Sequence, residues 1–275
     1  MLRVHLSSTD LARLVFQSVP HLDVAASLQL LRTSVPVTGF PGQWRRRALA
    51  ALPEQAAPLL DLVPVDGPLP DRLTAFRPLI ESGSTPPDLA TAYRSYERHC
   101  LSPMRTAAAT LRWRELARLR LLADRDGPGA ALSRLAPGIA WHDGILEIET
   151  ATDGDVDPHG RGLQVIPGLF WRRPGVRVAG LPRPALVYPM TAPVDHQVDP
   201  LARLLGATRA RVLRAVVTEP STSRLARLTG ISPASASEHA RVLREAGLAV
   251  TDRYGQEVRH RLTPMGLALA AGGTK

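Results

Sequence analysis

Residues 221–263 read STSRLARLTGISPASASEHARVLREAGLAVTDRYGQEVRHRLT, and this stretch decides the fold of the C-terminal part of the chain. A short helix is predicted over 224–229, after three residues with N-cap hydroxyls. Gly230 ends it, because glycine tolerates the left-handed conformation of a sharp helix exit. A second helix is predicted over 233–246, with Ser232 as its N-cap and proline at its first position. Two helices joined by so short a turn indicate a helix-turn-helix.

The second helix has the composition of a DNA-reading helix. Its inner stripe is small and apolar, while its first turns carry short or polar groups. A helix of this diameter fits the major groove of B-form DNA, where serines contact base edges or phosphates and a glutamate accepts from a cytosine amino group. For the histidine, packing within the protein and contact with DNA both stay open. The residues predicted to contact DNA here are Ser232, Ala234, Ser235, Ser237, Glu238, His239 and Arg241.

An alternating pattern follows Gly247. It predicts strands over 248–253 and 257–262, joined by a turn at 254–256. The second strand places apolar residues and His260 on one face and arginines on the other. A hairpin with arginines on its open face is a wing, which lies along phosphates or enters the minor groove. The wing residues predicted to hold phosphates are Arg253, Arg259 and Arg261.

Several motifs in this segment resemble the winged-helix repressors of the arsenic-repressor (ArsR) type. They are SRLARLTGIS at 223–232, Ser237 and His239 in the reading helix, LREAGL at 243–248, and Leu262-Thr263-Pro264 followed by Gly266. The resemblance implies a C-terminal winged helix-turn-helix domain and a homodimer formed by its first and last helices. Metal-sensing members of that family carry paired cysteines in the first helix of the motif. This chain has Arg224, Leu225 and Ala226 there, which excludes a metal sensor of that design.

The charge of the chain is concentrated in the same part. The formal net charge is +9, and residues 199–275 contain twelve basic and six acidic residues, a surplus of +6 that leaves +3 for residues 1–198. A local basic surplus is the expected electrostatic footprint on nucleic acid. Cys100 is the single cysteine, so an intramolecular disulfide is excluded and a reducing cytoplasm fits. The sequence shows neither an apolar run long enough to span a bilayer nor a signal-peptide profile, so no membrane partner is expected.

Residues 1–198 are predicted to form a mainly helical domain with a small β-sheet, which makes the whole chain an α+β protein. An edge strand is predicted over 2–6, and a turn at Asp143-Gly144 predicts a hairpin over 141–149. A polar connector at 195–199 leads into the C-terminal domain at 199–275. Helices are predicted over 11–18, 24–32, 44–52, 59–63, 88–99 and 103–123, and short strands over 163–166, 176–178 and 186–188.

Four stretches of this first part resemble the N-terminal domain that accompanies such a winged helix in predicted regulators from high-GC bacteria. They are DLARLVFQSVP at 10–20, HDGILEI at 142–148, GRGLQVIPGLF at 160–170 and LVYP at 186–189. The resemblance supports the architecture and names no chemistry. A sensor of a small-molecule effector, or a protein-interaction domain, would account for the length of this region.

Other candidate sites in the first part carry less chemistry. Residues 153–157 have the D-x-D-x-D rhythm of a calcium loop, but Pro158 replaces the required glycine and Gln164 the bidentate glutamate, so calcium is rejected. Trp44 and Trp113 are candidates either for the core or for the lining of a ligand cavity. We predict no cofactor and no metal.

The leading interpretation is a sequence-specific transcriptional regulator, a dimeric repressor that reads a palindromic operator in double-stranded DNA. One alternative is a winged-helix scaffold for protein interaction that does not bind DNA. Another is an enzyme with an N-terminal catalytic domain. The sequence contains no nucleophile elbow, phosphate-binding glycine loop or metal-ligand spacing, so we predict that the protein is not an enzyme.

Overall fold

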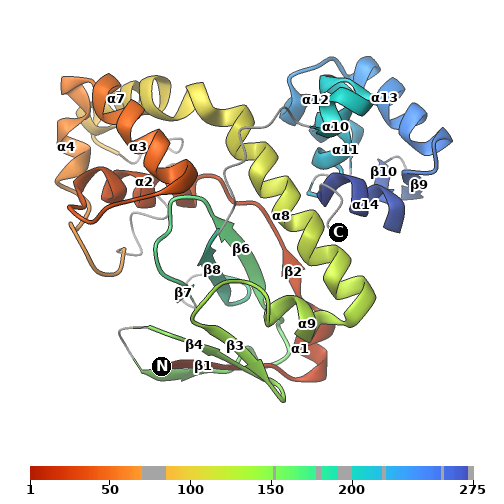
Figure 1. Ribbon diagram of the computed structural model, residues 1–275, viewed down its shortest axis with the longest axis horizontal. Coiled ribbons are helices and arrows are strands. Elements are labelled where there is room, and N and C mark those ends of the chain that lie inside the picture. Colours follow the sequence, from red (N-terminus) through yellow and green to blue (C-terminus); the bar gives the residue numbers. More distant parts are fainter. Residues whose placement is uncertain are drawn as a thin grey trace.

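A computed structural model describes residues 1–69, 85–150, 153–177, 181–190, 200–218, 221–254 and 257–271. The fold is mixed, with 53% helix and 17% strand in several small sheets, which agrees with the predicted α+β class. Figure 1 shows the long helix α8 (Arg105–Asp126) crossing the molecule. The helices between residues 22 and 96 lie at one end of α8, the two sheets of the N-terminal part lie along one side, and the C-terminal elements lie along the other.

The first part of the chain forms two four-stranded sheets, where the sequence predicted one small sheet. The first has the order β3-β4-β1-β5 and the second β2-β6-β8-β7. The predicted hairpin is confirmed, because Asp143 and Gly144 form its turn with φ of 45° and 89°. The strands are β1 (Leu2–His5), β2 (Val15–Phe16), β3 (Ile139–His142), β4 (Ile145–Ile148), β5 (Gly154–Val156), β6 (Gln164–Gly168), β7 (Gly175–Arg177) and β8 (Ala185–Pro189).

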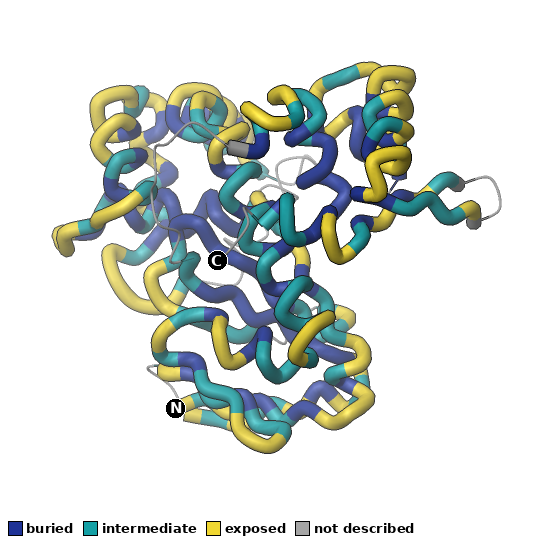
Figure 2. The backbone as a smooth tube through the Cα atoms, turned by 45° about the vertical axis from the view of Figure 1, so that its right-hand side comes forward, coloured by how far each residue is buried: buried dark blue, intermediate teal, exposed yellow. Residues whose placement is uncertain are grey.

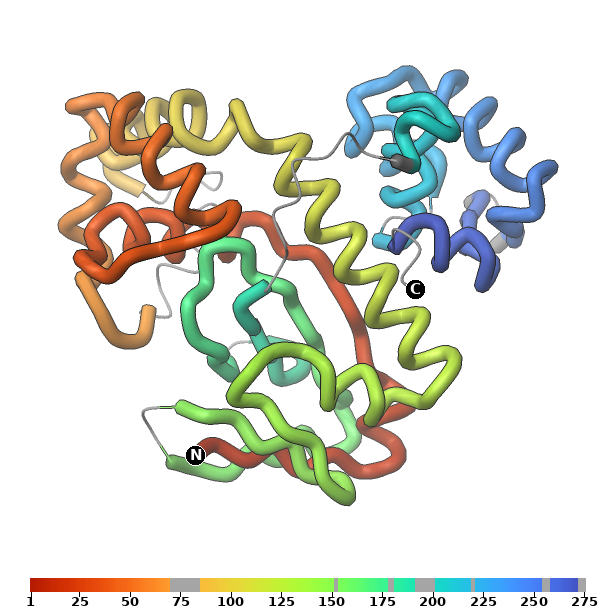
Figure 3. The backbone as a smooth tube through the Cα atoms, viewed as in Figure 1, coloured from red at the N-terminus to blue at the C-terminus, as the bar shows by residue number. Residues whose placement is uncertain are grey.

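Two predictions for the start of the chain are wrong. The strand over 2–6 is not an edge strand, because β1 pairs antiparallel with β4 and parallel with β5. The helix predicted over 11–18 is instead the short α1 (Ser8–Ala12), after which the chain extends into β2. Figure 3 shows this segment running beside α8, and β2 pairs in parallel with β6, which lies about 150 residues further along the chain.

The helices between residues 22 and 96 enclose a second core. Trp44 is buried there, its ring centroid lies 4.4 Å from that of Phe170, and its Nε1 donates to the carbonyl of Cys100 at 2.8 Å. Trp44 is therefore a core residue. A π-helical turn (Glu97–Leu101) and a 3-10 turn (Ser102–Met104) separate two helices where the sequence predicted a simple break. The helices around this second core are α2 (Leu22–Arg32), α3 (Gly39–Ala51), α4 (Ala57–Leu60) and α7 (Pro87–Tyr96). The short helix α9 (Pro128–Leu132) instead buries Ala131 and Leu132 in the core shared by the sheets and α8.

In its described residues, the C-terminal part has four helices, a two-stranded hairpin and a last helix. The predicted connector at 195–199 and residues 255–256 of the predicted turn lie outside the described residues. Both α11 and α14 pack against α8. Leu116 and Leu119 of α8 belong to the same buried cluster as Leu213 and Leu267, so one hydrophobic core crosses the predicted boundary at 198/199. The elements are α10 (Pro200–Leu205), α11 (Ala207–Ala215), α12 (Thr222–Thr229), α13 (Pro233–Glu245), β9 (Ala249–Tyr254), β10 (Glu257–Leu262) and α14 (Pro264–Ala271).

Gly266 is required where the hairpin returns to α14. A Cβ atom at this position would lie 2.0 Å from the carbonyl oxygen of Leu248, so no larger residue fits without moving the backbone. This close approach fixes α14 against the base of the hairpin.

Candidate nucleic-acid interface

The turn between α12 and α13 follows the residues that predicted it. Gly230 adopts the left-handed conformation, with φ 68° and ψ 35°, and ends α12. Ser232 caps α13 by accepting a hydrogen bond from the amide of Ser235 at 3.1 Å. The side-chain hydrogen bond predicted to cap the start of α12 is absent from the described residues. Ser221 occupies the N-cap position, but its side chain makes no capping hydrogen bond.

The front of α13 faces solvent. The buried side of this helix consists of Ala236, Ala240 and Leu243, as predicted, and it packs against α11, α12 and β9. None of the described N-terminal elements covers the opposite side. His239 is half-buried, and its Nδ1 has no hydrogen-bond partner among the described residues. The exposed residues of this front are Ser232, Pro233, Ala234, Ser235, Ser237, Glu238, Arg241 and Arg244.

Two of the predicted contact residues on α13 pair with each other. Arg241 donates to both carboxylate oxygens of Glu238, from Nη2 at 2.7 Å and from Nε at 2.9 Å, and its Nη1 donates to Glu245 at 2.5 Å. The hydrogen bonds that Arg241 donates hold the pKa of Glu238 below its usual value, and the same bonds, accepted by Glu238 and Glu245, raise the pKa of Arg241. In the free protein, one arginine thus faces two glutamates, and this part of the helix reaches a net charge of zero only with Arg244 included. A base or phosphate contact by either residue requires exchange of the pair.

The hairpin β9–β10 presents arginines on its outer side. Figure 2 shows it extending away from the body of the protein, buried at its base and exposed further out. Arg259 and Arg261 are exposed, whereas Leu262 and His260 are buried, which confirms the predicted alternation along the second strand. Arg253 is exposed on the first strand, but it pairs with Val258 and so lies on the opposite face from Arg259 and Arg261. Arg261 lies 3.5 Å from Asp252, an exposed ion pair of little energetic weight.

His260 ties the hairpin to the start of α12. Its Nε2 lies 3.0 Å from the hydroxyl of Thr222, and its Nδ1 lies 3.0 Å from the hydroxyl of Thr251. Burial, with a further contribution from the charge of Arg244, lowers the pKa of this imidazole below its ordinary value. The neutral ring therefore holds the hairpin at a fixed position beside the helix pair.

We expect acid to weaken this attachment. In the unfolded chain, His260 has the ordinary pKa of 6.5, whereas its pKa in the folded protein is lower. Near and below pH 6.5 the unfolded state therefore binds more protons than the folded state. The free energy of unfolding contributed by His260 is complete above this pH and falls as the pH drops through it. Thermal unfolding between pH 7.5 and 5.5 measures the effect, and His260→Gln should show a smaller pH dependence than the natural protein. Equal pH dependence of the two proteins would contradict the assignment.

Three arginines that the sequence analysis only counted in the basic surplus are given distinct places by the structure. Arg214, counted in the basic surplus, is 1% exposed and adds nothing to a contact surface. Arg209 of α11 lies close enough to Glu238 for its charge to help lower the pKa of that carboxylate. Arg244 is exposed on α13 beside the hairpin. Sequence reasoning missed Arg209 as a contact candidate, because the crossing of α11 and α13 is a tertiary contact without a local signal. It also missed Arg244, although this residue lies on the predicted reading helix.

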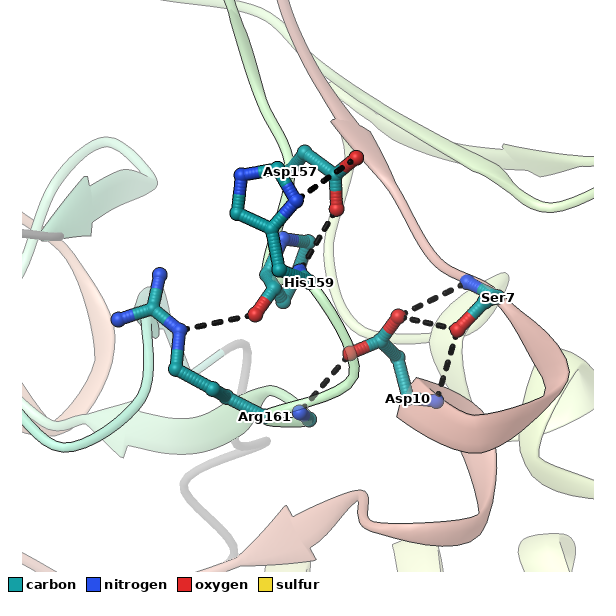
Figure 4. A network of polar contacts seen from close by, with 7 residues as sticks. Ser7, Asp10, Asp157, His159 and Arg161 are labelled. Atoms are coloured by element: carbon teal, nitrogen blue, oxygen red, sulfur yellow. Dashed lines mark hydrogen bonds and ion pairs between the residues drawn. The ribbon is translucent and has the colours of Figure 1, made fainter.

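A polar network near the N-terminus contains a serine, a histidine and carboxylates, shown in Figure 4. Asp10 accepts from the amide and hydroxyl of Ser7 and from the amide of Gly162 at 2.9 Å. Burial by itself raises the pKa of Asp10, but these hydrogen bonds outweigh it and leave the pKa below its ordinary value. His159 lies 3.4 Å from Asp157, and no hydrogen bond joins it to Ser7 in the described chain. The network is therefore a capping box that holds the 157–162 loop, not a serine nucleophile with its base.

The buried thiol of Cys100 and the possible metal ligands of the described residues are further candidates for a site. Cys100 is 4% exposed, and burial raises the pKa of its thiol to about 11, which keeps it protonated at neutral pH. Within the described ranges, no three histidine, cysteine, aspartate or glutamate side chains are grouped as a metal site would require.

Comparisons with protein-family models, with curated proteins and with solved structures found no match for this chain. Among the helices of the described chain, none is both long enough and apolar enough to cross a bilayer.

Proposed function

We propose that this protein is a winged-helix transcriptional regulator of the ArsR type, a cytoplasmic repressor that binds double-stranded DNA. The observation that carries the proposal is the exposed, serine-rich front of α13 beside a hairpin that exposes Arg259 and Arg261 on one face and Arg253 on the other. Helix width and groove width match, and the hairpin supplies the positive charge that a phosphate backbone requires.

In this proposal, the reading helix α13 contacts the bases and the hairpin contacts the phosphates. The first turns of α13 enter the major groove, where Ser235 and Ser237 reach base edges. The short side chain of Ala234 allows the helix to approach the bases closely. The hairpin arginines bind phosphates on the flanking backbone and set the orientation of the helix, without reading sequence themselves.

A two-fold dimer would place two copies of α13 about 34 Å apart, in successive major grooves of a palindromic operator. In the resembled family the first and last helices of the domain make the dimer contact. Here α14 packs along α8 of the same chain, with Leu267 and Ala270 in the shared core. We therefore assign the dimer contact to the α10 side, where Leu204 is 70% exposed.

Selection of bound fragments from a random DNA pool tests the proposal. Enrichment of a palindrome with half-sites one helical turn apart would support both DNA reading and the dimer. Absence of any enriched sequence would favour the alternative, a winged-helix scaffold for protein interaction.

We expect Arg259→Ala to weaken binding to all DNA sequences alike. Log K falls as log salt rises, and each lost phosphate contact makes this fall less steep by roughly one unit, because about one counterion fewer is released. Arg46→Ala, which removes an exposed arginine from α3, is the charge-matched control and should leave the slope unchanged. Fluorescence anisotropy at several salt concentrations gives both slopes. An unchanged slope for Arg259→Ala would count against the role of the hairpin.

A further inference from the structure

A cavity of about 550 Å³ lies where α12 faces the N-terminal helices. One side is formed by α2, α7 and α8, and the other by α11, α12 and the cap residue Gly230. Ligand pockets commonly have volumes of roughly 300–1,000 Å³ and occur at the junction of two parts of a chain. The cavity thus has the size and position of a small-molecule site.

The two sides of the cavity differ in chemistry. The N-terminal side contributes Trp113, Phe170 and Met104, a wall of aromatic and thioether surface. The C-terminal side contributes Arg211, Arg224 and Arg227. A ligand that satisfies both sides has an apolar body and an anionic group.

The two carboxylates of the cavity lining each have an arginine partner on the N-terminal side. Asp23 is paired with Arg112 at 2.7 Å, and Glu97 lies 3.4 Å from Arg105, so both acids of the lining already have arginine partners.

Arg211 and Arg227, in contrast, have no carboxylate partner among the described residues. In the same part of the chain, the Nε of Arg211 is buried without a hydrogen-bond partner. Buried donors of this kind are costly unless a partner is supplied.

We propose that this cavity binds a small organic anion with an aromatic or aliphatic body, and that its occupancy controls the position of α12. The anionic group lies against Arg211 and Arg227, and the apolar body lies against Trp113 and Phe170. Because α12 packs directly on α13, a ligand that links α12 to α8 alters how the reading helix is presented. This second step rests on the proposed DNA-binding function, whereas the binding step does not.

Two fluorescent probes that differ in charge test the binding step on the full chain. The probes are 1-anilinonaphthalene-8-sulfonate, which is anionic, and its uncharged analogue N-phenyl-1-naphthylamine. We expect one sulfonate molecule to bind per chain. Arg211→Gln and Arg227→Gln should each raise its Kd about tenfold, the usual effect of a lost charge-assisted hydrogen bond, and leave the Kd of the neutral probe within about twofold.

Two further variants serve as controls. Arg203→Gln removes an exposed arginine of α10 outside the cavity and should change neither Kd. Thr106→Trp places a large side chain at an exposed position of the cavity lining and should weaken the binding of both probes. An unchanged Kd of the sulfonate in Arg211→Gln and Arg227→Gln, or an equal loss in Arg203→Gln, would overturn the binding site.

The coupling step is measured separately on a selected operator. Saturating sulfonate should change the Kd for DNA by about fivefold or more, the lower range of allosteric coupling, and Arg227→Gln should reduce that change. An unchanged Kd for DNA with the probe bound would overturn the coupling and leave the site intact. If no DNA is bound under any condition, the proposed function fails, while the probe titrations still decide the cavity.

Discussion

Ala234→Glu is expected to abolish operator binding while leaving the protein as stable as before or slightly more stable. Ala234 is exposed in the first turn of α13, where a carboxylate interacts favourably with the helix dipole, by about 0.3–1 kcal/mol. In the proposed complex, the same carboxylate would enter the major groove between two phosphate backbones. Like charges juxtaposed in an interface cost several kcal/mol, so we expect affinity to fall at least about a hundredfold.

Ala107→Glu is the matched control for this substitution. It adds the same charge to an exposed alanine in the first turn of α8, outside the reading helix and the hairpin. Its effect on the free energy of unfolding should resemble that of Ala234→Glu, while its operator affinity stays near the natural value. Urea unfolding and anisotropy titrations measure the two quantities. Similar DNA affinities of the two variants would contradict the placement of α13 in the groove.

Features fixed by neighbouring residues could be predicted from the sequence. Gly230 ends one helix and Ser232 begins the next, because the left-handed exit and the N-cap hydrogen bond are both local. The turn at Asp143-Gly144 and the burial of His260 between exposed arginines follow for the same reason. The exposed front of α13 was predictable as well, because its small inner residues are spaced at the helical period.

Features fixed by distant partners could not be predicted. The strand β2 has two residues and exists because β6 pairs with it, so the local sequence still read as helix. The central place of β1 depends on β4 and β5, which come more than 140 residues later. The burial of Arg214 arises from packing that no local pattern records.

The candidate site shows the same division. Exposure of the predicted contact residues followed from helical and strand periodicity. The pairing of Arg241 with Glu238 and Glu245 uses i,i+3 and i,i+4 spacings, so the sequence could have predicted it. Instead, Arg241 and Glu238 were each predicted to contact DNA. The cavity assembles side chains from α2, α8, α11 and α12, and only the folded chain brings them together.

Asp23→Ala is expected to cost about 3–5 kcal/mol of the free energy of unfolding, the largest stability loss that we predict. The carboxylate of Asp23 is buried and accepts four hydrogen bonds. Oδ2 accepts from Nε and Nη2 of Arg112 at 3.2 and 2.7 Å, and Oδ1 accepts from the amides of Leu169 and Phe170 at 2.9 and 3.3 Å. This one group joins α2, α8 and the loop after β6. Its removal leaves a buried guanidinium and two buried amides without their acceptor.

Two comparisons separate these contributions in urea unfolding. Asp88→Ala also removes an acid from the first turn of a helix, but Asp88 is exposed, so its loss should stay within about 1 kcal/mol. The double variant Asp23→Leu with Arg112→Met removes the unpaired charge and should lose less stability than Asp23→Ala. It should not recover fully, because the amides of Leu169 and Phe170 still lack an acceptor, at about 1–3 kcal/mol for each buried group. A loss for Asp23→Ala no greater than for Asp88→Ala would mean that water or another side chain replaces the carboxylate.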